Sequence, residues 1–235
     1  RFDDTDVPKA LQRLKNKAPE LYELFEESLS IMFPEFTSIN LNEYTLTDQN
    51  VERQMMVTVA DKKLSEEEIE KEIPFKLREH IYRLFVKCDY MNQPLSMANM
   101  STGTKRVIWL LANAYIANYM EAGIVGIEEI ETSIHPKMMR QLLEIITEAL
   151  GNAPLIISSH SPYLVQYLKP DKIYIGVPNN RGVAEFRRIQ KSKMKVIISN
   201  ARDMGLSVGE YLFELLSGDS DSYETLESLL EVLDS

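Results

Sequence analysis

The segment that most constrains the fold is GIVGIEEIETSIHP, residues 123–136. Three β-branched residues within 124–127 form a short apolar run, which predicts a buried strand. Glu128 and Glu129 follow directly, where this strand would leave the sheet. Acidic side chains at the carboxyl end of a buried parallel strand lie in the ligand crevice of an open α/β sheet. The segment therefore predicts an α/β fold that handles a nucleoside triphosphate and its magnesium ion at this edge.

Two further segments flank this strand at similar distances along the chain. Upstream, MSTGTKRVIWLLANAYIANYM (100–120) is a small polar turn followed by a long helix with an apolar face. Downstream, APLIISSHSPYLV (153–165) is a second apolar strand that ends in Ser-Ser-His before Pro162 opens a helix. We expect the strands at 124–127 and 155–159 to be neighbours, so that the acids and the imidazole of His160 share one edge.

In this order and spacing, the three segments resemble the C-terminal lobe of an ABC-type ATPase head. MSTGTKR is similar to the signature motif, GIVGIEE to the Walker B strand, ETSIHP to the D-loop and IISSHSP to the switch histidine. The resemblance covers about residues 95–175 and is strongest to the RecF, SMC and OLD-like ATPases, many of which serve in DNA repair or anti-phage defence. It implies an α/β fold, the C-terminal part of a P-loop head with a mainly parallel sheet flanked by helices, and a helical tail.

The resemblance implies ATP and Mg²⁺ as cofactors and assigns roles to three side chains. Glu129 would polarise the attacking water as general base, although a capping carboxylate in a strand-to-helix loop is the structural alternative. Glu128 would contact magnesium, with a side chain one methylene longer than the aspartate that is usual in the family. His160 would contact the γ-phosphate and water.

The turn Ser101-Thr102-Gly103-Thr104 would bind the γ-phosphate of nucleotide held by a second subunit, as the resemblance implies. A helix start of this kind favours anions, because its N–H groups and positive dipole end face the ligand. A simple Ser/Thr N-cap is the alternative. Glu131 is either a support of the site or a solvated loop carboxylate, and His135 is more consistent with a structural role than with a direct one.

No GxxxxGK[ST] phosphate loop occurs in the 235 residues. The chain also opens on Arg1, so we expect it to be the C-terminal part of a larger polypeptide. The expected activity is ATP hydrolysis by the full-length dimer, with these residues inactive alone.

Composition restricts the location and the partners. The net charge of −10 argues against a broad nucleic-acid surface, which needs clustered cations. A single cysteine fits a reducing, cytoplasmic compartment, and no apolar run is long enough to span a membrane. The expected partners are a second copy, as a homodimer or higher oligomer through the head, and an effector protein. Nucleic acid would be contacted only through parts outside this chain, and no membrane is expected.

Hydrophobic periodicity predicts the remaining elements. Domain boundaries are expected at 1–95 (helix and strands leading into the lobe), 96–190 (ATPase C-lobe) and 191–235 (helical tail). The predicted helices are 8–33, 136–149 and two or three over 191–234, and the predicted strands are 36–46, 53–60, 82–87 and a hairpin of 172–177 with 182–189, with a charged connection at 62–75.

Two functions of other classes remain possible. An OLD-type nuclease would add a Toprim domain, but no glutamate-bearing strand followed by a DxD strand end occurs after residue 176, which disfavours it. A non-catalytic module that only binds partners would keep the fold and lose hydrolysis.

Overall fold

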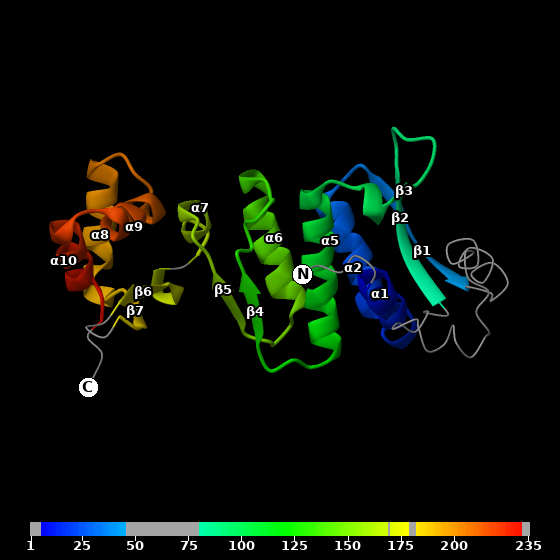
Figure 1. Ribbon diagram of the computed structural model, residues 1–235, viewed down its shortest axis with the longest axis horizontal. Helices are drawn as coiled ribbons and strands as arrows, with labels where there is room; N and C mark the ends of the chain where they lie inside the picture. The colour runs from blue at the N-terminus through cyan, green and yellow to red at the C-terminus, as the bar shows by residue number, and fades with distance from the viewer. Residues whose placement is uncertain (1–5, 46–79, 169, 179–181, 232–235) are drawn as a thin grey trace, which may run out of the picture. The chain divides into compact units, whose positions relative to one another are not determined.

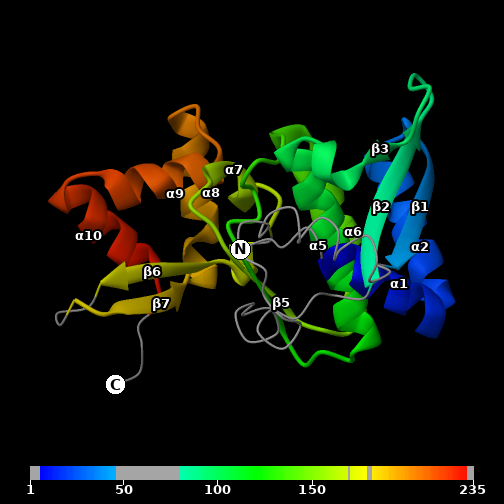
Figure 2. The same cartoon turned by 45° about the vertical axis from the view of Figure 1, so that its right-hand side comes forward.

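The computed structural model describes residues 6–45, 80–168, 170–178 and 182–231 (Figure 1; Figure 2). The strand predicted at 53–60 and the charged connection at 62–75 lie outside these residues. The chain divides into two compact units, residues 1–125 with 141–155 and residues 126–140 with 156–235. The class is mixed α/β with a parallel strand pair, as the sequence predicts.

The first unit begins with two helices where the sequence predicts one over 8–33. Helix α1 (Asp6–Lys17) ends before Ala18, whose φ of −144° is not helical, and α2 (Pro19–Met32) starts at Pro19. Proline lacks the N–H that would continue the α1 hydrogen-bond ladder, but it suits the first position of a new helix. The prediction of a single helix is therefore wrong. The apolar spacing continues from one helix into the next, but Pro19 starts a new helix.

Both helices pack against the long helix α5 (Thr102–Tyr119), as Figure 1 and Figure 2 show. Their shared core includes Phe25, whose ring meets the edge of Tyr115 at a centroid distance of 6.3 Å. The Tyr115 hydroxyl shares a 2.7 Å hydrogen bond with the buried Ser28 hydroxyl. Burial raises the pKa of Tyr115, because the phenolate would lose its hydration.

An antiparallel sheet of order β1–β2–β3 completes the first unit. Its long pair joins β1 (Phe36–Thr45) to β2 (His80–Cys88), with Ile39 opposite Val86. The predicted strands at 36–46 and 82–87 are thus confirmed. The short elements that lead to α5 are β3 (Leu95–Ser96) and η1 (Met97–Asn99).

The central elements are β4 (Val125–Glu128), α6 (Pro136–Ala149) and β5 (Leu155–Ser158), which match the predicted segments closely. Backbone hydrogen bonds run from Val125 N to Pro154 O and from Glu129 N to Ser158 O, both 2.9 Å long. The residue numbers of the hydrogen-bonded partners increase in the same direction along both strands, so the strands are parallel.

The second unit contains the predicted hairpin and helical tail. Strand β6 (Tyr174–Pro178) pairs antiparallel with β7 (Ala184–Arg188). Ile175 and Val177 of the hairpin belong to one core with the tail helices, which also holds the fully buried Leu226. The other elements are α7 (Pro162–Val165), η2 (Pro170–Lys172), η3 (Lys191–Lys193), α8 (Met194–Asp203), α9 (Val208–Ser217) and α10 (Ser220–Leu229).

Close backbone approach fixes α9 against α7. A Cβ added to Gly209 would lie only 2.2 Å from the carbonyl oxygen of Pro162, so no larger residue fits there without movement. Among the described residues, no helix combines the length and the apolar character needed to cross a membrane.

Candidate functional site

The carboxyl ends of β4 and β5 place the predicted acids and histidine at one edge of the parallel pair. Glu128 is the last residue of β4, and Glu129 donates its N–H to Ser158, the last residue of β5. His160 follows two residues later. We call residues 128–131 with 159–160 the strand-end site. The expectation that strands 124–127 and 155–159 are neighbours is confirmed.

These two strands are more exposed than the sequence suggests. Both alternate between half-buried and exposed residues, and the side chains of Ile124 and Ile156 are 60% and 59% exposed. Glu128, Glu129 and His160 are exposed as well. A parallel sheet is normally covered on both faces, and such an apolar run looks buried from sequence alone. The prediction that the strand at 124–127 is buried is therefore wrong for the described chain.

Glu129 sits in a constrained backbone turn. Its φ is +44°, in the left-handed region that non-glycine residues rarely occupy, and Ser133 in the same loop has φ +64°. The Glu129 Oε2 atom accepts a 3.2 Å hydrogen bond from the Thr132 hydroxyl, and its carbonyl oxygen accepts from Thr132 N at 3.0 Å. Strained residues of this kind are held by their surroundings and gather at functional sites.

Glu131 links the two strand ends, a role that sequence reasoning left open. Its Oε1 accepts a 2.6 Å hydrogen bond from the Ser159 hydroxyl and a 3.3 Å hydrogen bond from the backbone N–H of His160. The Ser159 oxygen in turn accepts from Ser161 N at 2.9 Å. The Oε2 atom of Glu131 is buried and has no hydrogen-bond partner within the described residues. Buried polar atoms normally have a hydrogen-bond partner, so this oxygen is placed to accept a hydrogen bond from a donor outside the described residues.

His135 has the structural role that the sequence favoured. Its Nδ1 accepts a 3.2 Å hydrogen bond from the backbone N–H of Lys137 at the start of α6. The ring thus satisfies one of the N–H groups that a helix start leaves without a partner.

The signature-like turn belongs to the first unit and forms a capped helix start. The Ser101 hydroxyl accepts from Thr104 N at 3.1 Å and lies 2.8 Å from the Thr104 hydroxyl. Thr102 and Gly103 form the first turn of the 18-residue helix α5. Capping and anion binding are compatible here, because one hydroxyl satisfies one N–H while the helix dipole remains. Near this end, the Arg106 guanidinium lies 5.4 Å from the centroid of the Trp109 ring.

Magnesium would need more ligands than the described residues supply together. No three His, Cys, Asp or Glu side chains group into a metal site within the part of the chain that the structure describes. Mg²⁺ commonly takes one or two carboxylates and completes its shell with water and substrate phosphates. The exposed carboxylate of Glu128 is suited to be one of these carboxylate ligands.

Comparison with known proteins places these residues in a family context. Residues 25–166, which include both the signature-like turn and the strand-end site, match the family described as "AAA domain, putative AbiEii toxin, Type IV TA system". No curated protein matches the chain.

Several solved structures of SMC ATPases are similar at low sequence identity. One comes from work on ATP-driven dimerisation and DNA-stimulated activation of SMC ATPases, with 14% identity and a TM-score of 0.48, covering 82% of this chain and 97% of that one. A second is an Smc head bound to the C-terminal winged-helix domain of ScpA, with 16% identity, a TM-score of 0.49, and coverage of 80% and 49%. A third is the Smc head of Pyrococcus yayanosii with a coiled coil and joint, with 13% identity, a TM-score of 0.49, and coverage of 81% and 31%. The chain thus spans about half the length of the second structure and about a third of the length of the third.

Proposed function

We propose that this chain, which belongs to the AAA-domain family described as putative AbiEii toxins of type IV toxin–antitoxin systems, is the γ-phosphate-sensing lobe of an ATPase that dimerises around ATP. The observation that carries the proposal is the strand-end site. Two adjacent carboxylates at the end of β4 lie beside the Ser159–His160 loop at the end of β5, and Glu131 bonds to that loop.

Three side chains of the site have separate tasks in this proposal. Glu128 supplies a carboxylate oxygen to the magnesium ion that accompanies the triphosphate. Glu129 orients a water molecule for in-line attack and accepts its proton. His160 donates a hydrogen bond to the γ-phosphate. Phosphoryl transfer demands positioning and charge stabilisation more than covalent chemistry, so a few fixed groups suffice.

Two further parts complete the site in this proposal. The phosphate loop that holds ATP is supplied by another stretch of polypeptide, since no GxxxxGK[ST] is present here. Ser101, Thr102, Gly103 and Thr104 of one copy approach the nucleotide held by a second copy. ATP binding thereby favours the dimer, and hydrolysis releases it.

The biological setting that we infer is anti-phage defence, with DNA repair as the alternative. The family description names a toxin–antitoxin system, which favours defence. In that setting the dimer controls an effector protein, and the ATPase cycle sets when the effector is released.

Glu129→Gln in the full-length protein tests the assignment of the base. The amide keeps the size of the side chain but cannot accept the proton, so kcat for ATP hydrolysis should fall by about 10²- to 10⁴-fold. ATP-bound dimers should accumulate at the same time, which size-exclusion chromatography with light scattering would detect. Glu144→Gln, an exposed glutamate on α6, is the matched control and should leave both readouts unchanged.

Turnover that persists in Glu129→Gln would show that Glu129 is not the base. A wild-type protein that binds ATP without hydrolysing it would instead favour the non-catalytic partner-binding module.

A further inference from the structure

The hairpin β6–β7 turns an aromatic and cationic face outward. Strand alternation places Tyr174, Gly176, Phe186 and Arg188 on this face, and we call these four residues the hairpin face. The side chains of Tyr174 and Phe186 are 50% and 66% exposed. Large aromatic side chains that stay exposed together mark binding surfaces more often than isolated ones do.

Side-chain contacts order this face before any ligand arrives. The Arg188 guanidinium lies 4.8 Å from the centroid of the Tyr174 ring, and its Nε donates a 2.6 Å hydrogen bond to the Tyr174 hydroxyl. The ring of Phe186 covers Gly176, where an added Cβ would lie 3.1 Å from it. Tyr174 and Phe186 are diagonal neighbours across the two strands, a spacing of about 7–8 Å.

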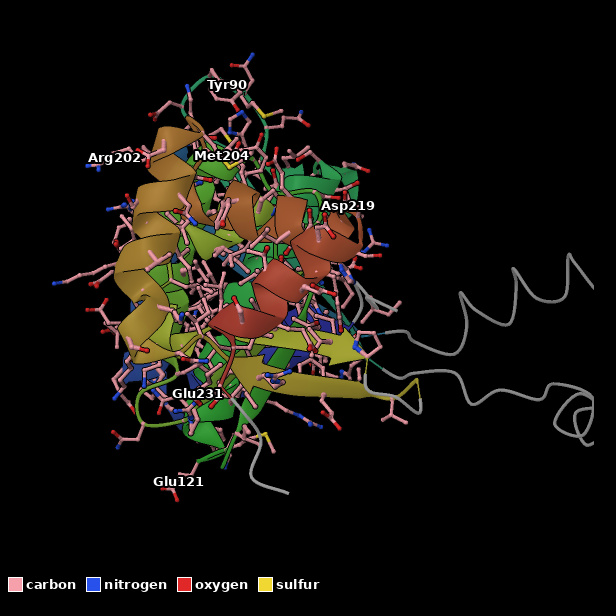
Figure 3. All side chains as sticks on the ribbon, turned by 90° about the vertical axis from the view of Figure 1, so that its left-hand side faces the viewer. Tyr90, Glu121, Arg202, Met204, Asp219 and Glu231 are labelled. Atoms are coloured by element: carbon pink, nitrogen blue, oxygen red, sulfur yellow. The ribbon has the colours of Figure 1, made fainter. Side chains whose placement is uncertain are left out.

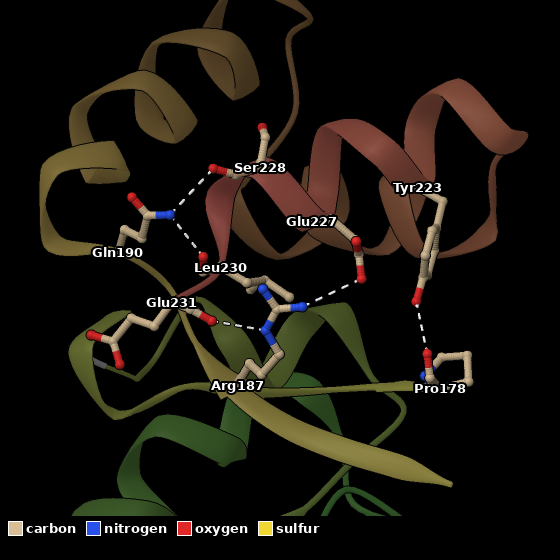
Figure 4. Close-up of polar contacts among 8 residues, drawn as sticks. All are labelled: Pro178, Arg187, Gln190, Tyr223, Glu227, Ser228, Leu230 and Glu231. Atoms are coloured by element: carbon tan, nitrogen blue, oxygen red, sulfur yellow. Dashed lines mark hydrogen bonds and ion pairs between the residues drawn. The ribbon is translucent and has the colours of Figure 1, made fainter. Parts of the chain in front are cut away.

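The opposite face of the hairpin is tied down. Figure 4 shows Arg187 donating to the Glu231 carbonyl oxygen at 2.8 Å and to Glu227 Oε1 at 3.3 Å. Gln190 Nε2 donates to the Leu230 carbonyl oxygen at 2.7 Å, and the Tyr223 hydroxyl donates to the Pro178 carbonyl oxygen at 3.4 Å. These contacts attach the hairpin to α10 and the residues that follow it, so the hairpin face points away from the tail helices.

Positive charge gathers in the same stretch of an acidic chain. Residues 172–195 contain seven Lys or Arg and one acid, Glu185, although the whole chain has a net charge of −10. Lys172 precedes β6, and Lys191 follows β7, so both flank the open end of the hairpin where Tyr174 pairs with Arg188. Of these cations, Arg188 lies against the Tyr174 ring, and Lys172 and Lys191 are close to this pair along the chain, whereas Arg187 bonds to Glu227 on the opposite face. Cations beside exposed rings are the pattern that attracts a polyanion with planar groups.

We propose that the hairpin face binds single-stranded nucleic acid. Two successive unpaired bases stack on Tyr174 and Phe186, and the Arg188 guanidinium and the flanking lysines contact the phosphates. Arginine has five N–H donors, so contact with one tyrosine hydroxyl leaves donors for a phosphate. The overall acidity of the chain does not prevent this, because binding depends on the charge near the strand rather than on the sum.

Exposed rings distinguish this ligand from the other polyanions. The faces of bases in a duplex are covered by neighbouring bases, so a duplex would contact the cations but could not stack on the rings. An acidic protein segment would also use the cations and gain little from two adjacent ring faces. The hairpin face therefore favours unpaired bases over both.

The test measures fluorescence anisotropy of labelled oligo(dT) and oligo(U), about 20 nucleotides long, with the full-length protein and no ATP. Omitting ATP separates this result from the proposed ATPase. Phe186→Ala and Tyr174→Ala should each weaken binding by about five- to hundredfold, and Phe186→Trp should retain it. Arg188→Gln should weaken binding and reduce its salt dependence by about one phosphate contact.

Two exposed residues elsewhere serve as matched controls. Tyr90, which is 74% exposed, and Arg202, on α8, both point outward in Figure 3. Tyr90→Ala and Arg202→Gln should bind the oligonucleotides like wild type.

Three results would overturn the proposal. The first is no binding of either oligonucleotide by the wild-type protein, and the second is equal affinity for a duplex of the same length. The third is unchanged affinity in both Phe186→Ala and Tyr174→Ala. If only Arg188→Gln weakens binding, the surface is instead a cationic patch for an acidic partner.

Discussion

Glu131 joins two loops that leave different strands. Its Oε1 holds the Ser159 hydroxyl and the His160 backbone N–H, so the position of the histidine depends on a residue of the loop after β4. A displacement of about 1 Å at a reacting group can lower a rate about 100-fold. Glu131 is thus a positioning residue if His160 contacts the γ-phosphate as proposed.

At the residue scale we expect Glu131→Ala to lower kcat of the full-length ATPase by about tenfold to hundredfold. Glu131→Gln keeps a carbonyl oxygen as acceptor and should lose less. Steady-state ATPase assays would measure both variants, and circular dichroism would check that they fold.

A double-mutant cycle with His160→Ala separates positioning from a general structural role. If Glu131 acts through His160, removing Glu131 from the His160→Ala background should have little further effect. Fully additive losses would contradict this role.

At the scale of elements, helix caps explain where several helices start. Ser207 precedes α9 and forms a capping box: its hydroxyl accepts from Glu210 N at 3.2 Å, and Ser207 N donates to Glu210 Oε2 at 2.8 Å. The hydrogen bond from the Ser207 backbone N–H, with a smaller contribution from the Ser207 side chain, lowers the pKa of the Glu210 carboxyl, because it favours the charged form.

This lowered pKa predicts a pH-dependent contribution to stability. The contribution is present above the unfolded-state pKa of about 4.5 and disappears as the pH falls through the lower folded-state pKa. Glu210→Ala should therefore lower Tm by about 2–4 °C at pH 7, and the difference from wild type should shrink as the pH falls below about 4.5.

Thermal unfolding followed by circular dichroism at several pH values would measure the Tm difference between Glu210→Ala and wild type. Glu224→Ala, an exposed glutamate on α10, is the control and should show no such pH dependence. A Glu210→Ala difference that stays constant down to pH 3 would contradict the capping argument.

At the scale of the whole molecule, apolar residues form a separate core in the second unit. The side chains of Ile197, Leu226 and Leu230 are fully buried there together with Ile175 and Val177 of the hairpin. This core lies within the compact unit formed by residues 126–140 and 156–235.

Leu226→Ala should lower the free energy of unfolding of this unit by about 2–5 kcal/mol, because it leaves a cavity in the core. Hydrogen exchange should accelerate over residues 173–230 and stay close to wild type over 102–119. Leu216→Ala, with a side chain 39% exposed, should have a much smaller effect. Acceleration of equal size in both segments would show that the two units unfold as one.

Local patterns along the chain were enough to predict several of the elements. Apolar runs bounded by turn residues identified β4, β5, α6 and the β6–β7 hairpin, because period and turn chemistry act over a few neighbouring residues. The same runs identified the edge at which Glu128, Glu129 and His160 lie, since parallel strand ends meet there.

Features that depend on residues far apart in the chain became visible only in the folded structure. Exposure of Ile124 and Ile156 depends on what covers the sheet, and the contact between Glu131 and Ser159 joins residues 28 positions apart. The outward direction of Tyr174 and Phe186 likewise follows from which hairpin face packs on the tail helices. Burial and long-range hydrogen bonds are properties of the folded arrangement, so no local pattern encodes them.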